Sequence, residues 1–355
     1  MATDFQANAL PALIGSLPLT DHGEAVNLVL KYTPEIPLWV QLPSHKEEGM
    51  MVQFLSGMPG LMACGEKTFI NTEKETFESE LLEFYEDYLS VTDGGKDLSD
   101  SRFGLETSTA AGFFEFLRKL EKTDIQPVAL KGQITGPVTM GTGVVDQNSR
   151  AIFYDERLLD AMVKLIALKA RWQVRKLKKF GCPVILFFDE PALTGFGSSA
   201  FISISKEEIS ACFAEVIDAV HAEGGIAGIH VCANAEWSLI LDSPADIVSF
   251  DAYSYFDKFV LYPDQIRKFM ASGGILAWGI VPTLNAEDLK KETADSLTAL
   301  WEERAKGIES LGIDPSVIIA QSLITPSCGT GSLSLDQAEK VLRMTSEVSR
   351  KIRSR

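Results

Sequence analysis

A histidine and two cysteines follow apolar runs that have the length and composition of buried strands. His230 and Cys232 lie two positions apart at the end of one run, and Cys328 follows the last run. Since residues i and i+2 of a strand face the same way, the imidazole and the first thiol can converge on one point. Both groups are preferred ligands of zinc. With Asp251 at the end of the next strand, the sequence predicts a catalytic-type zinc site with the ligands His230, Cys232, Asp251 and Cys328.

Eight predicted strands position these side chains, and most of them are apolar nearly throughout, as in a parallel sheet that is buried on both faces. They span residues 13–16, 37–42, 127–132, 184–189, 226–231, 247–251, 275–279 and 317–322. Amphipathic helical patterns lie between them, so the alternation predicts an α/β fold with a single (β/α)8 TIM barrel. In such a barrel, reactive side chains gather at the carboxyl ends of the strands. A doubly wound sheet is the rival fold, but no G-x-G-x-x-G follows the first strand and no Walker loop is present.

The connection between the second and third predicted strands is long. Residues 45–121 contain several helical patterns and a polar loop. We interpret this stretch as an elaborated crossover, because no linker rich in Pro, Gly or Ser separates it from the rest of the chain. The sequence therefore predicts one barrel domain over residues 1–355. Ser205 with Glu208, and Ser334 with Gln337, are capping boxes that predict two helix starts.

The composition is that of an ordinary soluble globular protein. Of the 355 residues, 46% are hydrophobic, and 33 basic against 49 acidic side chains give a net charge of −16. Nucleic acids and anionic membranes select for clustered Lys and Arg, so neither is expected as a partner. Five cysteines are too few, and odd in number, for a disulfide scaffold. This count indicates a reducing, cytoplasmic location.

Several short motifs occur in the order in which one enzyme family has them. Residues 14–18 read I-G-S-L-P, 135–139 read T-G-P-V-T and 189–193 read D-E-P-A-L, and H-x-C and C-G follow at 230–232 and 328–329. In this pattern the chain resembles the catalytic carboxyl-terminal barrel of cobalamin-independent methionine synthase. That barrel belongs to a superfamily that includes uroporphyrinogen decarboxylase. The resemblance extends from about residue 13 to residue 335.

The resemblance implies a zinc-dependent methyltransferase of the kind that serves methionine biosynthesis. It implies that the H-x-C and C-G motifs hold zinc, and that Asp251 stands where the family has a glutamate ligand. It also implies that Ser16 and Asp189 bind the amino-acid end of a small thiol substrate such as homocysteine. Because zinc deprotonates a coordinated thiol, we expect the acceptor to react as a zinc thiolate.

The methyl donor is expected to be a methylcorrinoid, free or on a corrinoid protein, or a methyl-folate. A methyl-folate leaves as an amine that must be protonated. The family's histidine after the seventh strand is absent here, where residues 278–282 read W-G-I-V-P. A corrinoid leaves without a proton and is therefore favoured as the donor. If the donor is a methyl-folate, His45 is the first candidate for the residue that protonates it. Three other interpretations stay open: a cofactor-free decarboxylase of the uroporphyrinogen decarboxylase type, a methyltransferase acting on another thiol such as coenzyme M, and a non-enzymatic zinc-binding or corrinoid-binding protein.

Overall fold

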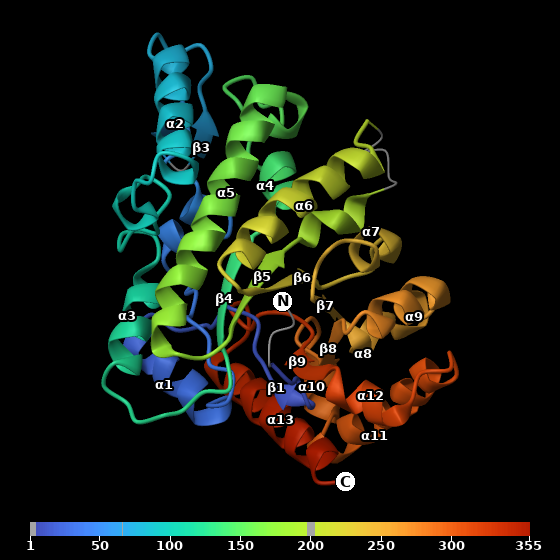
Figure 1. Ribbon diagram of the computed structural model, residues 1–355. Coiled ribbons are helices and arrows are strands. Elements are labelled where there is room, and N and C mark those ends of the chain that lie inside the picture. The colour runs from blue at the N-terminus through green and yellow to red at the C-terminus, as the bar shows by residue number, and fades with distance from the viewer. Residues whose placement is uncertain (1–4, 66, 197–202) are drawn as a thin grey trace.

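The centre of the protein is a curled parallel sheet (Figure 1). The computed structural model describes residues 5–65, 67–196 and 203–355. The strands of the sheet are β1 (Leu10–Pro11), β4 (Leu130–Thr135), β5 (Val184–Asp189), β6 (Ile226–Val231), β7 (Ile247–Phe250), β8 (Ile275–Val281) and β9 (Ser322–Pro326). Their spatial order is β1-β9-β8-β7-β6-β5-β4, and all neighbouring pairs are parallel. The chain therefore has the α/β class and the parallel sheet that the sequence predicts.

Residues 37–42 contact both edges of this sheet without forming a regular strand. On one side, the N–H of Lys131 on β4 donates to the carbonyl oxygen of Pro37 at 2.9 Å. On the other side, the N–H of Gln41 donates to the carbonyl oxygen of Gly15 at 3.0 Å. Isolated parallel bridges accompany these bonds. The predicted second strand is present only in this form, and a closed eight-stranded barrel stays a prediction.

The predictions are accurate for the middle strands and poor at the last one. Strands β5 to β8 lie within two residues of their predicted bounds, β4 begins three residues later than predicted, and β1 ends before residue 13. The strand predicted at 317–322 is wrong, because a helix, α12 (Pro315–Ala320), occupies most of it and β9 follows. Asp314 caps this helix by accepting from the N–H of Ser316, and Pro315 occupies its first turn.

Helices surround the sheet, and several of them cover its outer face (Figure 1). They are α1 (His22–Tyr32), α2 (Phe77–Thr92), α3 (Ala111–Leu120), α4 (Pro137–Gly143), α5 (Glu156–Leu177), α6 (Lys206–Ala222), α7 (Trp237–Leu241), α8 (Ala252–Phe259), α9 (Pro263–Ala271), α10 (Ala286–Lys291), α11 (Ala294–Glu309), α12 and α13 (Leu335–Arg353). Helix α5 packs on β4 and β5, α6 on β6, α11 on β8, and α13 on β1 and β9. The predicted capping boxes are confirmed at the starts of α6 and α13. Within the described residues, no helix combines the length and apolarity that crossing a membrane requires.

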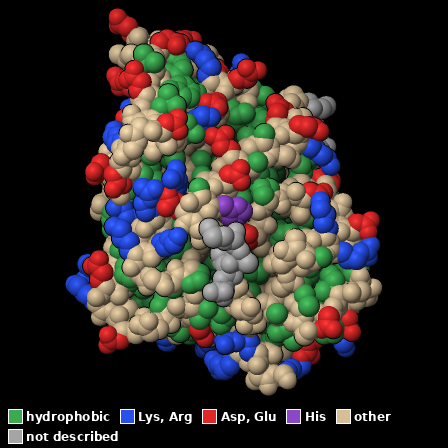
Figure 2. All heavy atoms as spheres, in the orientation of Figure 1, with side chains coloured by type: hydrophobic (Ala, Val, Ile, Leu, Met, Phe, Trp, Pro, Cys, Tyr) green, Lys and Arg blue, Asp and Glu red, His purple; other side chains and the backbone are tan. Residues whose placement is uncertain are grey.

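The stretch predicted as an elaborated crossover contains short elements and a hairpin. Two three-residue 3-10 helices, η1 (Lys46–Glu48) and η2 (Val52–Phe54), precede the hairpin and α2, and a third, η3 (Leu98–Asp100), lies between α2 and α3. The antiparallel pair β2 (Leu61–Cys64) and β3 (Lys67–Ile70) was not predicted, because its strands are short and partly exposed. On the face drawn in Figure 2, acidic side chains gather over α2 at the end of the molecule that this stretch forms. The single-domain organisation stays a prediction.

The two faces of the sheet belong to two separate apolar cores. On β5, Val184 and Leu186 face the helices, whereas Ile185 and Phe187 face the inside of the curl. The inner core contains no helical residue from the described parts of the chain. It consists of Phe5, Ala7, Leu10, Ala12, Ile14, Ile36, Ala129, Ile185, Phe187, Ile226, Ile247, Ile275, Ala277 and Leu323. Towards the carboxyl ends of the strands, the same inner face carries polar side chains, and the candidate site lies there.

Candidate metal centre

A cavity of about 250 Å³ opens at the carboxyl ends of the strands. Its lining includes the predicted metal ligands His230, Cys232 and Cys328 and the predicted substrate-binding residues Ser16 and Asp189. The structure therefore brings together all the predicted site residues except Asp251. The other residues that line the cavity are Ile14, Gly15, Gln41, Pro43, Glu48, Gly49, Met50, Pro191 and Gly329.

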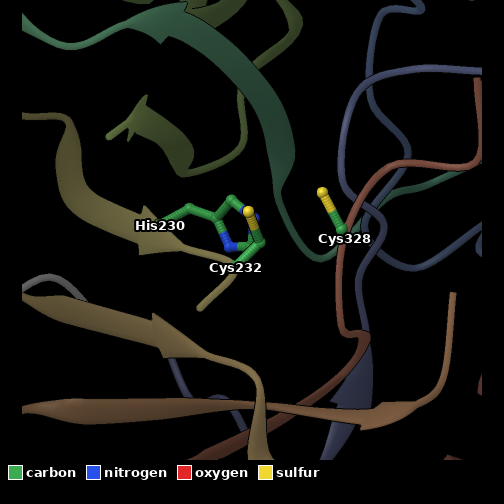
Figure 3. A group of neighbouring side chains, drawn as sticks. All are labelled: His230, Cys232 and Cys328. Carbon is green, nitrogen blue, oxygen red and sulfur yellow. The ribbon is translucent and has the colours of Figure 1, made fainter. Parts of the chain in front are cut away.

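Three potential metal ligands approach one another in this cavity. One ligand atom each from His230, Cys232 and Cys328 lies within 4.8 Å of the other two. Figure 3 shows His230 and Cys232 at the end of β6, with Cys328 facing them from the segment after β9. Zinc at its usual bond lengths holds such atoms roughly 3.5–4 Å apart, so small side-chain movements would close the set around one ion.

His230 is oriented as a metal ligand is. Its side chain is buried, and Nδ1 lies 2.9 Å from the hydroxyl oxygen of Ser249 on the neighbouring strand β7. Its other nitrogen, Nε2, is buried and has no hydrogen-bond partner. Burial, assisted by the Lys131 ammonium, lowers the pKa of His230 to about 3, so the ring is neutral. A neutral imidazole that donates from Nδ1 presents the lone pair of Nε2, which is the form that coordinates a metal.

The two thiols hydrogen-bond to each other. This bond lowers the pKa of Cys232, because the thiol of Cys328 donates to the Cys232 sulfur, and the same bond raises the pKa of Cys328. Burial opposes ionisation of both. Cys232 therefore ionises more readily than Cys328, and a cation between the sulfur atoms would favour ionisation of both. A divalent metal supplies that charge.

Asp251 lies outside this group. It follows β7 and caps α8, where its Oδ1 accepts from the N–H of Ser254 at 2.8 Å. Its Oδ2 is buried without a partner, and burial raises the pKa of the carboxyl group. The role of Asp251 as a fourth ligand stays a prediction, and its side chain is not among those that approach one another in the metal-binding group. Three protein ligands with a further open position are typical of catalytic zinc.

Asp189 lies beside a buried lysine that the sequence analysis did not single out. Neither Oδ1 of Asp189 nor Nζ of Lys131 has a hydrogen-bond partner. The Lys131 Nζ lies 4.2 Å from the centre of the Phe187 ring. Burial raises the pKa of Asp189 and lowers that of Lys131, and their mutual attraction opposes both shifts. The cavity thus contains a carboxylate with an unfilled acceptor position.

The residue after Asp189 has a structural role. Glu190 is fully buried, and its carboxylate accepts from the N–H groups of Val138 and Thr139 and from the hydroxyl of Thr139. Burial raises the pKa of Glu190 to about 7, and these hydrogen bonds oppose the shift. Glu190 thereby fixes the first turn of α4 against the end of β5, next to the cavity.

Ser16 joins the amino-terminal segment to the loop that carries Cys328. Its hydroxyl oxygen accepts from the N–H of Gly331 at 3.2 Å, and its carbonyl oxygen accepts from the N–H of Thr330 at 2.9 Å. A Cβ atom at Gly329 would collide with the Ser16 hydroxyl. The glycine after Cys328 is therefore required for this close approach.

Glu48 is the cavity residue that sequence reasoning missed. It lies on η1, is 4% exposed and lines the cavity, although no motif marks it. The only sequence feature that could have indicated Glu48 is its position as an acidic residue shortly after the second predicted strand. His45, the alternative proton donor, does not line the cavity. Its Nε2 lies 2.9 Å from the carbonyl oxygen of Thr20, and its ring stacks on His22.

The chain has no match among protein-family models or among curated protein sequences. Among solved structures, it is similar to a methyltransferase from Methanosarcina mazei, at 14% identity and a TM-score of 0.50, over 95% of this chain and 94% of that one. A GH20 catalytic module of the pneumococcal exo-β-D-N-acetylglucosaminidase StrH aligns at 11% identity and a TM-score of 0.49, over 96% and 85%. The first likeness shows a shared overall fold, and the second carries no argument.

Proposed function

We propose that this protein is a zinc-dependent methyltransferase that methylates a small thiol. The observation that supports this most directly is the convergence of the His230 imidazole and two thiols in a cavity that also contains an unpartnered carboxylate. The Methanosarcina mazei structure of the same fold is a methyltransferase, which is consistent with methyl transfer. The proposal includes a barrel in which residues 37–42 serve as the eighth strand.

The donor set fits zinc. Two thiols and one imidazole are the ligands that zinc prefers, and they leave a position for the acceptor. When bound, zinc lowers the pKa of a coordinated thiol, so that its sulfur is a nucleophile at neutral pH. Ser249 holds the imidazole of His230 in the coordinating tautomer, and Asp189 orients the acceptor by its other end.

The charges of the cavity favour an acceptor that carries an ammonium group. Asp189 and Glu48 line it, Lys131 lies buried beside Asp189 outside the lining, and none of the described lining residues is Lys or Arg. The unpartnered Oδ1 of Asp189 can accept from an ammonium group of the substrate. A sulfonate thiol such as coenzyme M, or the tetra-acid substrate of a uroporphyrinogen decarboxylase, would instead require basic side chains. We therefore propose homocysteine or a related aminothiol as the acceptor.

We propose a methylcorrinoid as the donor in preference to a methyl-folate. Strand β8 is apolar and fully buried. In the family that this chain resembles, a proton-donating histidine follows the corresponding strand. Among the described residues that line the cavity, the only histidine is the metal ligand His230, so no free imidazole takes the place of the family's proton donor. General acid catalysis contributes roughly 10²–10⁴ in rate, and only the folate leaving group needs it.

The test is a comparison of donors and acceptors on zinc-loaded protein. We expect kcat/KM with methylcobalamin to exceed that with 5-methyl-folate by at least about 100-fold when homocysteine is the acceptor. Coenzyme M should be a poorer acceptor than homocysteine. Equal rates with the two donors would refute the donor assignment, and methylation of no thiol from either donor would refute the proposed function.

A further inference from the structure

We propose that Glu48 and His22 form a proton path from the cavity to a groove on the outer surface. The path would remove the proton that the acceptor thiol loses when its sulfur becomes a nucleophile. This inference rests on the proposed function and adds to it a route for the proton. Neither residue belongs to the metal-binding group.

The side chain of Glu48 is held by two hydrogen bonds. Its Oε1 lies 2.6 Å from Nε2 of His22, and its Oε2 accepts from the N–H of Leu42 at 2.8 Å. Only 3% of the Glu48 side chain is exposed. Because each carboxylate oxygen can accept more than one hydrogen bond, the carboxylate can still accept a proton from the cavity that Glu48 lines.

His22 leads from this carboxylate to a second hollow. It is the first residue of α1, and 17% of its side chain is exposed. It lines a groove of about 620 Å³ whose other walls come from α1, α3 and the segment that precedes α3. The groove and the cavity share no lining residue. The His22–Glu48 pair therefore connects two spaces that are otherwise separate.

The proton balance of the path is simple. The S–H bond of the acceptor breaks, its electron pair stays on sulfur, and the proton goes to the Glu48 carboxylate. In the resting pair, the Nε2–H of His22 donates to Oε1 of the Glu48 carboxylate. Once Glu48 holds the thiol proton, a tautomer exchange through groove water moves the ring proton of His22 from Nε2 to Nδ1. Glu48 then passes a proton from Oε1 to Nε2 while the ring releases its Nδ1 proton to water in the groove, which restores the resting pair. One proton moves from thiol to solvent, and nothing is oxidised or reduced.

Several charged groups face the two residues. Glu48 faces His22 from α1 and shares the cavity with Asp189. The His22 ring stacks on His45, with ring centres 5.1 Å apart. Around the groove, the charged side chains are Asp21, Glu24, Glu115, Arg118 and Lys119. The groove carries both signs of charge, so it can release a proton without accumulating a strong positive potential.

The experiment measures proton release and turnover on the zinc-loaded full chain. Homocysteine is added with a pH indicator in a stopped-flow instrument, and methylation is followed with methylcobalamin. We expect His22→Gln and Glu48→Gln to slow proton release at least about 10-fold, since proton transfer by a positioned side chain contributes 10²–10⁴ in rate. His221→Gln is the matched control, because His221 pairs with Asp246 at 2.8 Å in an exposed pair away from the cavity. It should release protons at the wild-type rate.

Chemical rescue separates a proton path from a structural pair. Imidazole in solution should raise the rate of His22→Ala several-fold, because the groove admits it, and should not raise the rate of Glu48→Gln. Wild-type proton release in His22→Gln, or no rescue of His22→Ala, would overturn the path while leaving the proposed function intact. A wild-type protein that binds zinc but releases no proton with homocysteine would overturn both.

Discussion

The two ends of the inner face of the sheet differ in chemistry, although the same strands build them. At the amino end, Ile185, Ile226 and Ile247 are fully or almost fully buried and pack against one another. At the carboxyl end, Asp189 on β5 pairs in register with His230 on β6, and both carry buried polar atoms without hydrogen-bond partners. A buried unpartnered polar group costs about 1–3 kcal/mol, so the carboxyl end carries a cost that the amino end avoids.

This difference indicates which end stabilises the fold and which end binds. The apolar layer gains free energy simply by excluding water. Under the proposed function, a metal and a substrate would supply the missing partners of the polar layer, so its residues would add little stability to the protein without them. Substitutions at the amino end should therefore lower the stability and leave binding nearly unchanged. Substitutions at the carboxyl end should weaken binding and leave the stability nearly unchanged.

The largest effect is expected from the metal ligands. His230→Ala and Cys328→Ser should reduce zinc from about one per chain to nearly none and should abolish methylation. The check is metal analysis after gel filtration, with Cys64→Ser, an exposed thiol on β2, as the control. Stoichiometric zinc in both ligand variants would place the metal elsewhere.

The second effect concerns the substrate end of the polar layer. Asp189→Asn keeps the shape of the side chain but removes its charge, and it should weaken acceptor binding by roughly 10- to 100-fold, as loss of a charged hydrogen bond does. Zinc content should stay at the wild-type value. The double variant Lys131→Met/Asp189→Asn controls for the lysine that the single change leaves unpaired. Loss of zinc in Asp189→Asn would make Asp189 a ligand.

The third prediction tests the apolar layer. Ile247→Ala should lower the free energy of unfolding by about 2–5 kcal/mol, because it leaves a cavity in a fully buried core. The metal-binding affinity of the folded protein should be nearly unchanged. Denaturant unfolding and zinc titration, both on the same variant, measure the two quantities. A large loss of zinc affinity with little loss of stability would contradict the division between the two ends.

The last prediction concerns the residue that orients a ligand. Ser249→Ala removes the hydrogen bond to Nδ1 of His230 and should weaken zinc binding about 10- to 100-fold while leaving the site able to fill. Ser249→Thr, which keeps a hydroxyl, is the matched variant. Competition with a chelator gives the affinities, and identical values for the two variants would show that the hydroxyl does not orient the ring.

The sequence predicted the middle of the sheet well, because local signals suffice there. The apolar runs of β5 and β6 are bounded by polar or glycine residues and match the structure. The prediction for 317–322 failed because the four apolar residues at 317–320 suit a strand or a short helix equally, and the cap at Asp314 with Pro315 in the first turn favoured the helix. Residues 37–42 have a strand-like pattern, but they pair with the sheet only through isolated bridges, and their sequence does not show this.

The candidate site was predictable where strand geometry determines it. The approach of His230 and Cys232 follows from their spacing along one strand, and that of Cys328 from the curl of the sheet. Asp251 is not in the group, and its Oδ1 instead caps the amino terminus of α8, an interaction that the strand pattern does not reveal. Glu48 reaches the cavity through a 3-10 turn after an irregular segment, so only the three-dimensional fold reveals it.

The most direct test of the account is X-ray absorption at the zinc edge, with and without homocysteine. The account predicts two sulfur ligands and one imidazole nitrogen in the resting protein, from Cys232, Cys328 and His230, and a third sulfur when homocysteine is bound. Zinc without sulfur ligands, or a sulfur count that saturating homocysteine leaves unchanged, would contradict it.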